Sequence, residues 1–181
     1  MKPLVGLLAA LVIFLFTGGM PEGGKENRFV GTKKCAACHK SEKLGGTAYT
    51  VWEKSAHAGA YKTLLGDAAK KIAREKGLSV PPSEAPECLR CHVTGGGTAK
   101  NVDASFKKEE GVGCETCHGA ASGYLMVHNK KNSTEKAVAA GLVRGAKEAK
   151  SCTVCHNDQS PTFKGFTFDA MWAKVEHARK K

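Results

Sequence analysis

Four copies of the pattern C-x-x-C-H constrain this chain most, because together they use all eight of its cysteines. In this pattern two thiols form thioether bonds to the vinyl groups of a porphyrin, and the histidine after them ligates the iron. A helical turn would bring these side chains onto one face of the ring. The repeat therefore predicts four covalently bound haem c groups, attached through Cys35 and Cys38, Cys88 and Cys91, Cys114 and Cys117, and Cys152 and Cys155, with His39, His92, His118 and His156 as proximal ligands.

Zinc sites and thioredoxin-like redox pairs also contain C-x-x-C, so both are alternatives. Neither needs a histidine directly after the second cysteine. The chain has only seven histidines, so a histidine after every pair would arise by chance about once in several hundred thousand sequences of this composition. The pattern favours haem attachment over zinc.

Length and composition indicate how such a chain could pack. The 181 residues suggest a single domain. After removal of a leader, roughly 40 residues remain for each haem, which is little protein to bury four macrocycles. Aliphatic runs beyond the leader are short, whereas glycine and alanine, which let backbone approach a flat ring, are frequent. We expect haem, rather than aliphatic side chains, to form the core.

The net charge of +11 raises nucleic acid as a partner. However, the lysines are scattered among glycines, alanines and acids, with no aromatic residues interleaved in a basic patch and no nucleic-acid-binding motif. Dinucleotide-binding, Walker, metalloprotease and nucleophile-elbow motifs are also missing from the sequence. The composition favours a solvated lysine surface that docks acidic redox proteins, and not nucleic acid.

The N-terminus has the pattern of a secretory signal, with Lys2 followed by an apolar run over 4–16 and a small polar segment. About thirteen apolar residues are short for a membrane span. The cleavage pattern is unclear, so an uncleaved membrane anchor through 4–16 stays open. We predict a signal peptide or anchor at 1–19, a linker at 20–32 and a tetrahaem domain at 33–181. Export to the periplasm fits the motif, because c-type haems are attached outside the cytoplasmic membrane.

Periodicity predicts the helical segments. We expect helices at 49–65 and 67–76, and a C-terminal amphipathic helix at 168–179 with Phe168, Met171, Trp172 and Val175 facing inward. Asn132 and Glu135 have capping-box spacing before an alanine-rich segment. Residues 99–113 are a short hairpin or a loop.

Three histidines lie outside the motifs: His57, His128 and His177. His57 and His177 have small neighbours, which would let each reach an iron without the neighbours striking the porphyrin. His128 follows His118 too closely to fold over the opposite face of the same haem, so we expect it to serve another one. Surface histidines are the plain alternative. The nearby Met126 is more typical of packing than of a sulfur ligand.

Three distal histidines cannot complete four haems. If all three ligate iron, three haems are bis-histidine, low-spin electron-transfer centres, and the fourth iron can bind water or a small molecule. Gly95, Gly96 and Gly97 follow the second motif after Val93 and Thr94. They leave space and supply no ligand, although a plain flexible loop explains them equally well. We expect the haem on His92 to be the open one.

The segments between the motifs resemble the cytochrome c-554 family. The resemblance extends from about residue 33 to the C-terminus. The residues that carry it are Trp52, Ser55-Ala56-His57-Ala58, Cys91-His92-Val93, Gly111-Val112-Gly113-Cys114-Glu115, Cys117-His118-Gly119 and Phe168-Asp169-Ala170-Met171.

This resemblance implies a mainly α multihaem fold with little sheet, in which haems stack as near-parallel and near-perpendicular pairs. It implies three bis-histidine haems and a five-coordinate, high-spin second haem, which here is the one on His92. It suggests His128 as distal ligand of the first haem, with His57 and His177 serving the third and fourth in an order that stays open. It also implies a hydroxylamine oxidoreductase-like electron donor and a membrane cytochrome as acceptor.

Three functions are consistent with these features. The first is a periplasmic electron carrier, the second a reductase for nitric oxide or another nitrogen oxide at the His92 haem, and the third a subunit of a membrane complex anchored through 4–16. A high-spin signal and nitric oxide binding separate the first two. Detergent dependence separates the third from both.

Overall fold

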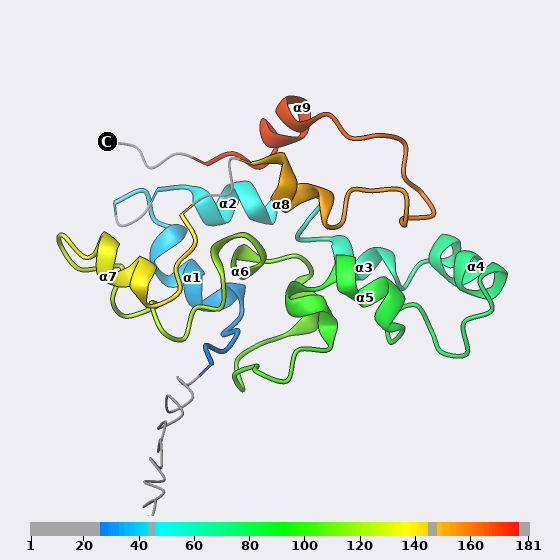
Figure 1. Cartoon of the computed structure of the whole chain (residues 1–181), viewed down its shortest axis with the longest axis horizontal. Helices are drawn as coiled ribbons and strands as arrows, with labels where there is room; N and C mark the ends of the chain where they lie inside the picture. The colour runs from blue at the N-terminus through cyan, green and yellow to red at the C-terminus, as the bar shows by residue number, and fades with distance from the viewer. Residues whose placement is uncertain (1–25, 44–45, 145–147, 178–181) are drawn as a thin grey trace, which may run out of the picture.

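The computed structural model describes residues 26–43, 46–144 and 148–177. The predicted leader at 1–19 lies outside these ranges. The described part is built from short helices joined by long loops (Figure 1). Its elements are α1 (Thr32–His39), α2 (Ala48–Glu53), α3 (Ala60–Thr63), α4 (Asp67–Glu75), α5 (Pro86–His92), η1 (Thr94–Gly97), η2 (Lys108–Glu110), α6 (Cys114–His118), α7 (Thr134–Ala139), α8 (Ala149–Thr153) and α9 (Phe168–Trp172).

The prediction of a mainly α fold is confirmed. In the described ranges, extended backbone pairs only at one isolated parallel bridge, between Phe29 and Val102. That bridge ties the N-terminal segment to residues 99–113, which form a loop with one 3-10 turn rather than a hairpin. No helix of the described ranges is long and apolar enough to cross a membrane.

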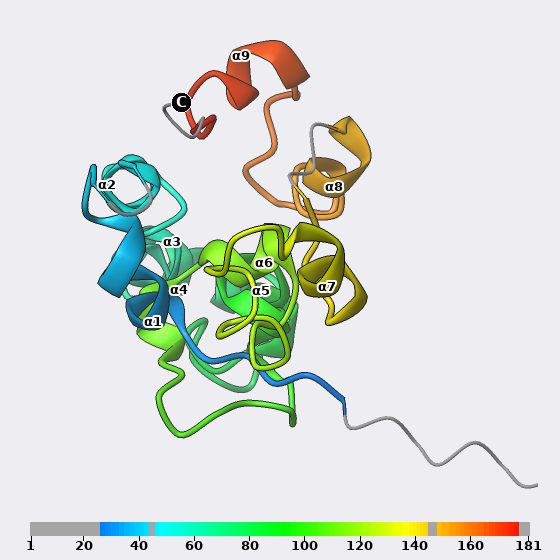
Figure 2. The same cartoon turned by 90° about the vertical axis from the view of Figure 1, so that its left-hand side faces the viewer.

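The elements form an elongated body. In Figure 1, α7 lies at one end and α4 at the other, with α5 and α6 between them. Figure 2, turned by 90°, shows α8 and α9 on one side of the remaining helices. The chain therefore returns over its own middle after α7, which brings its C-terminal quarter beside segments far away in sequence.

Apolar packing is sparse and divided between two small clusters. The first consists of Val30, Ala121, Tyr124 and Ala137, and the second of Tyr61, Leu64, Leu89 and Val93. Among the described residues, no large side chain is completely buried. Each cluster holds together a few short segments, but neither has the extent of an ordinary domain core. This sparseness fits a fold whose interior is completed by a cofactor.

Glu115 anchors the N-terminal segment to α6. Its carboxylate is buried and accepts hydrogen bonds from the backbone N–H groups of Val30 (2.9 Å), Gly31 (2.8 Å) and Ala121 (2.8 Å). A buried carboxylate needs such donors to offset its lost hydration. Val30 and Thr32 are themselves buried. Residues 29–32 of the predicted linker are therefore packed into the fold.

The predicted helix at 49–65 is wrong in its continuity. The structure has α2 and α3 instead, with His57 in the turn between them. The carbonyl oxygen of His57 accepts N–H groups from Ala60 (3.1 Å) and from the distant Val112 (3.0 Å), so a tertiary contact takes the place of the helical ladder. The next helix, α4, was predicted correctly at 67–76 to within one residue.

Two further expectations also need correction. The capping box does not form, because Asn132 has a left-handed φ of 55° and α7 begins at Thr134 without a side-chain cap. The predicted C-terminal helix at 168–179 is limited to α9, and Met171 on it is exposed. His177 therefore lies beyond the helix. Residues 178–181 lie outside the described ranges.

Candidate haem-binding sites

The four C-x-x-C-H motifs adopt the local geometry that haem attachment needs. Helices α1, α5 and α6 each end at the histidine of their motif. In the fourth motif, the His156 N–H donates to the Cys152 carbonyl (2.9 Å), which continues the turn beyond α8. A helical turn brings the cysteines and the histidine of one motif to a common side, as the sequence predicted.

The alternatives for the cysteines find no support in the structure. All eight are free thiols. No group of three or more His, Cys, Asp or Glu side chains within the described ranges is placed to hold a metal ion, and these ranges include every cysteine and histidine of the chain. These ranges therefore contain no such cluster and no formed disulfide.

Each histidine outside the motifs faces the ring of one motif histidine. The three pairs are His39 with His128, His118 with His177, and His156 with His57, and all have ring centroids 6.0 Å apart. Two imidazoles bound to opposite sides of one metal would have centroids about 6 Å apart, since each metal–nitrogen bond is about 2 Å and each ring centre lies about 1 Å further. The residues present thus fit a six-coordinate iron at three places.

The three pairs differ in the angle between their rings. His39 and His128 are nearly parallel, with 3° between the ring planes. The planes of His118 and His177 are tilted by 60°, and those of His156 and His57 by 58°. Ring orientation is set by neighbours such as Tyr124, whose ring meets His128 edge-on at 5.8 Å.

Backbone carbonyls fix which ring nitrogen is available. Nδ1 hydrogen-bonds to a carbonyl oxygen in His92 (Ala60, 2.7 Å), His118 (Val143, 3.0 Å), His128 (Tyr124, 3.1 Å) and His177 (Val175, 2.8 Å). A carbonyl accepts only from a protonated nitrogen, so Nδ1 carries the proton and Nε2 keeps its lone pair. A metal-bound histidine commonly has such a partner on its other nitrogen.

Burial favours the neutral imidazole at two of these positions. It lowers the pKa of His57, with a smaller contribution from the charge of His156. Burial is also the main cause that lowers the pKa of His118, although the hydrogen bond to Val143 opposes it. Only a neutral imidazole ligates metal, so these surroundings suit a ligand.

His92 differs from the other three motif histidines. No ring contact in the described ranges joins it to a second histidine, and its own Nδ1 lies near Ala60 and, at 3.2 Å, near the Thr63 hydroxyl. Met126, the sulfur alternative, has 70% of its surface exposed and lies in no ring or ligand-like contact with a motif histidine. The structure thus brings six of the seven histidines into pairs and leaves His92 single.

The glycines after His92 form a tight turn that packs against neighbouring residues. Gly95, Gly96 and Gly97 all have positive φ (68–70°) and make the tight turn η1. A Cβ on Gly97 would lie 2.7 Å from Leu89, and one on Gly95 would lie 3.1 Å from the Phe29 ring. Gly97 is therefore needed for close packing onto α5, and Gly95 for close packing against Phe29.

Cysteines of different motifs meet in a fixed sequence of neighbours. The Cys35 and Cys114 thiols are hydrogen-bonded, and this contact, followed by burial, raises the pKa of Cys35. Cys155 lies beside Cys91, and burial with the charge of Cys91 raises its pKa to about 12. Burial, followed by the charge of Cys152, raises the pKa of Cys117. Cysteines of the first and third motifs, of the third and fourth, and of the fourth and second are therefore near one another.

Sequence reasoning did not identify the residues that position these histidines. Tyr124 is buried, donates its hydroxyl to the Gly119 carbonyl (2.9 Å) and supports His128. Its position four residues before His128 was a usable helical-spacing signal. Glu115 lies inside the third motif, but nothing local revealed the distant amides that it binds. The carbonyl partners of Nδ1 have no side-chain signature at all.

C-x-x-C-H motifs in helical turns, whose histidines face a second imidazole in three of four cases, define a c-type cytochrome. The protein family described as "Cytochrome c554 and c-prime" matches residues 34–119 of the chain. Cytochrome c-554 of Nitrosomonas europaea is 30% identical over 174 residues, which cover 88% of this chain and 70% of that relative. The chain belongs to the cytochrome c-554 family. No solved structure matches it significantly.

Proposed function

We propose that the chain is a periplasmic cytochrome with four haem c groups that passes single electrons between redox proteins. The observation that carries the proposal is the set of three histidine pairs at a common centroid distance of 6.0 Å. Each haem, when bound, supplies an iron that alternates between two oxidation states one electron apart. Paired imidazoles on opposite sides let that change occur with little rearrangement of the protein.

The ligand assignment follows from the pairs. His39 and His128 serve the first haem, His118 and His177 the third, and His156 and His57 the fourth. The family resemblance left the order of His57 and His177 open, and the ring contacts of His57 with His156 and of His177 with His118 support this order. His92 alone holds the second iron, whose other side takes water or a small molecule.

The path through the molecule follows the neighbouring cysteines. The hydrogen bonds of Cys35 with Cys114 and of Cys155 with Cys91, and the proximity of Cys117 to Cys152, support an order of first, third, fourth and second haem. In this order the His39 and His92 sites are the two ends. The polypeptide's role is to hold the attachment edges adjacent and the imidazoles in place.

The experiment is a mass measurement followed by rapid mixing. Intact protein secreted with its native leader should carry the mass of four haems. A one-electron donor should reduce the oxidised protein, and no intermediate with a bound substrate should form. A mass of fewer haems, or a fully haem-loaded protein that exchanges electrons with no redox protein or reagent, would overturn the proposal.

A second candidate is a reductase for nitric oxide or another nitrogen oxide at the His92 haem. Among the described residues, no second histidine ring faces His92. This favours the reductase, because an iron with one protein ligand can bind a small molecule. The reduced protein should then bind nitric oxide and, with excess reductant, produce nitrous oxide. A protein that binds none in its reduced state is an electron carrier alone.

A further inference from the structure

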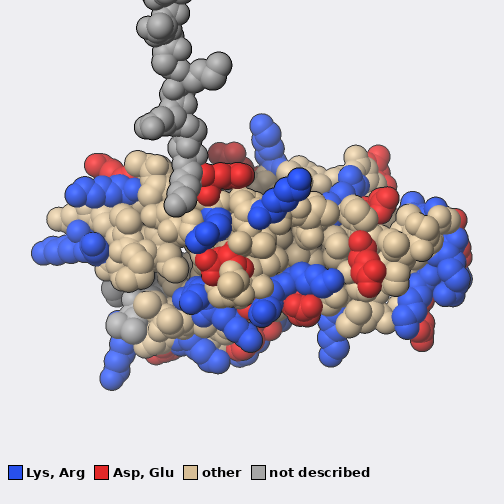
Figure 3. All heavy atoms as spheres, turned by 90° about the horizontal axis from the view of Figure 1, so that it is seen from below, with Lys and Arg blue, Asp and Glu red and all other residues tan. Residues whose placement is uncertain are grey.

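The two ends of the molecule both carry lysines, but the lysines are paired differently. On α4, Lys70 lies 3.2 Å from Asp67, and Lys71 lies 3.1 Å from Glu75. Among the described residues, no carboxylate forms an ion pair with Lys130 or Lys131 at the opposite end. Figure 3 shows blue side chains at both ends of the molecule, with red side chains among them. Lys130 and Lys131 are therefore available to carboxylates of another protein.

The unpaired lysines belong to a built turn. Ser133 is buried, and its hydroxyl donates to the Lys130 carbonyl at 2.6 Å. Asn132 adopts the left-handed conformation (φ 55°), and the Lys130 N–H donates to the Val127 carbonyl at 3.2 Å. These contacts close the backbone and leave both lysine side chains exposed. The loop from His128 to Thr134 thus presents two cations from a fixed backbone.

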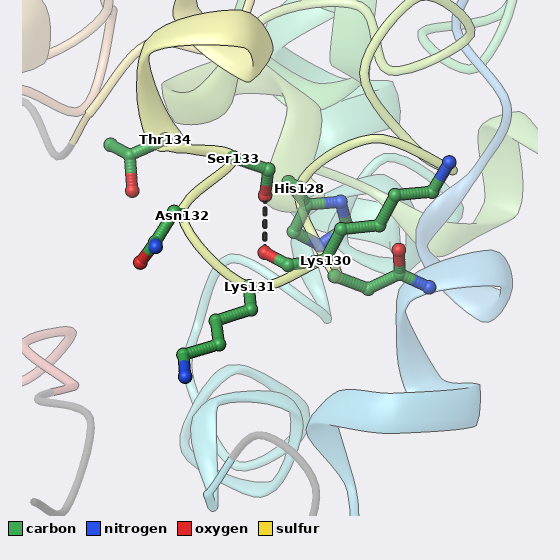
Figure 4. Close-up of a pocket in the computed structure, with 7 residues that line it drawn as sticks. His128, Lys130, Lys131, Asn132, Ser133 and Thr134 are labelled. Atoms are coloured by element: carbon green, nitrogen blue, oxygen red, sulfur yellow. Dashed lines mark hydrogen bonds between the residues drawn. The ribbon is translucent and has the colours of Figure 1, made fainter.

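This loop surrounds a hollow of about 530 Å³ that reaches a ligand histidine. His128 lines it together with Lys130, Lys131, Asn132 and Ser133 (Figure 4). His128 is the ring that faces His39. A molecule seated over the hollow would therefore lie beside the imidazole proposed to ligate the first iron.

From these observations we infer that the loop at 128–134 is the docking site for a carboxylate-rich surface of a redox protein. Electrons would pass between that protein and the first haem at His128. The inference rests on the proposed electron-transfer function and gives it a location and a partner chemistry. Opposite charges on two proteins raise their rate of association and orient them.

The spread of the charges favours a protein surface over a small anion. In Figure 4, Lys131 and Asn132 extend outward from the turn and not toward the His128 ring. A small anion needs donors that converge on one point, whereas separated cations fit separated carboxylates. The loop has the second arrangement.

The test compares two double variants of the full, haem-loaded protein. Lys130→Gln with Lys131→Gln removes two charges from the loop, and Lys70→Gln with Lys71→Gln removes the same number from α4. Reduction is followed by rapid mixing with a reduced plant-type ferredoxin as the acidic protein, and with reduced methyl viologen as a cationic reagent. We expect the loop variant to react about five- to tenfold more slowly with ferredoxin at low salt. High salt should abolish this difference, and the α4 variant should stay within twofold of the unsubstituted protein.

Several results would overturn the inference. These are a loop variant that reacts with ferredoxin within twofold of the unsubstituted protein, or equal slowing of the loop and α4 variants. Equal reaction of the loop variant and the unsubstituted protein with methyl viologen shows that the haems are intact. Failure of the unsubstituted protein to react with any of these reagents would instead contradict the proposed function.

Discussion

The ring centroids of His39 and His128 lie 6.0 Å apart, and the ring planes are only 3° from parallel. The second and third motifs lie between these two residues in sequence. His39 ends α1, and His128 follows a turn whose backbone carbonyl at Tyr124 holds its Nδ1. Two side chains on distant segments thus have the separation that two ligands of one iron would need. The other two pairs repeat the distance but not the angle.

Removing one distal histidine should open one iron. We expect His57→Ala to convert the fourth haem from low-spin to high-spin and to leave the other centres unchanged, because His57 faces His156 alone. Electron paramagnetic resonance of the oxidised protein measures this. Met126→Ala is the matched control, since that side chain is largely exposed, and its spectrum should equal that of the unsubstituted protein. An unchanged spectrum for His57→Ala would remove this residue from the ligands.

The ring angles should be visible in the same spectra. Parallel imidazoles act on the iron orbitals along one common direction and give a rhombic low-spin signal, whereas tilted rings give a signal with a larger maximum g value. We expect one rhombic signal, from the pair with 3° between its planes, and two of the other kind. His128→Ala should abolish the rhombic signal, and His177→Ala should retain it. The reverse outcome would contradict the assignment of ligands.

Loss of the Glu115 carboxylate should destabilise the fold. Three buried backbone N–H groups would lose their acceptor in Glu115→Ala, so we expect the free energy of unfolding to fall by about 3 kcal/mol or more. Denaturant unfolding of the haem-loaded protein measures the change. Glu135→Ala on α7 is the control, because Glu135 is exposed and should cost less than about 0.5 kcal/mol. Equal effects of the two substitutions would show that the Glu115 network contributes little.

The turn after His92 should tolerate no side chain. Gly97→Ala combines a positive φ with a Cβ that would lie 2.7 Å from Leu89, so we expect a loss of about 2–4 kcal/mol in unfolding free energy. Gly77 has the same kind of φ but nothing within 4 Å of an added Cβ. Gly77→Ala should therefore cost only about 1 kcal/mol. Denaturant midpoints that agree for the two variants would contradict the packing role of Gly97.

The attachment residues could be predicted from sequence because their chemistry is local. Two cysteines and a histidine within five residues reach one porphyrin through a single helical turn, and the structure keeps that turn in all four motifs. The number of histidines also indicated that one site would lack a distal ligand. Both conclusions depend on counting and spacing, which sequence provides.

The remaining features depend on contacts between distant segments. The helix predicted through His57 is interrupted because Val112 hydrogen-bonds to the His57 carbonyl, and periodicity cannot reveal such a partner. The sequence left the glycines after His92 as either an opening or a plain flexible loop, and their packing against Leu89 and Phe29 has no local signature. Which of His57 and His177 faces His156 is likewise decided by how the C-terminal segment returns over the molecule.

The central claim is that three irons have two histidine ligands and the iron on His92 has one. Electron paramagnetic resonance with spin quantitation of the oxidised, fully loaded protein tests it most directly. We expect three low-spin irons and one high-spin iron for each chain. Four low-spin irons, or more than one high-spin iron, would contradict this assignment.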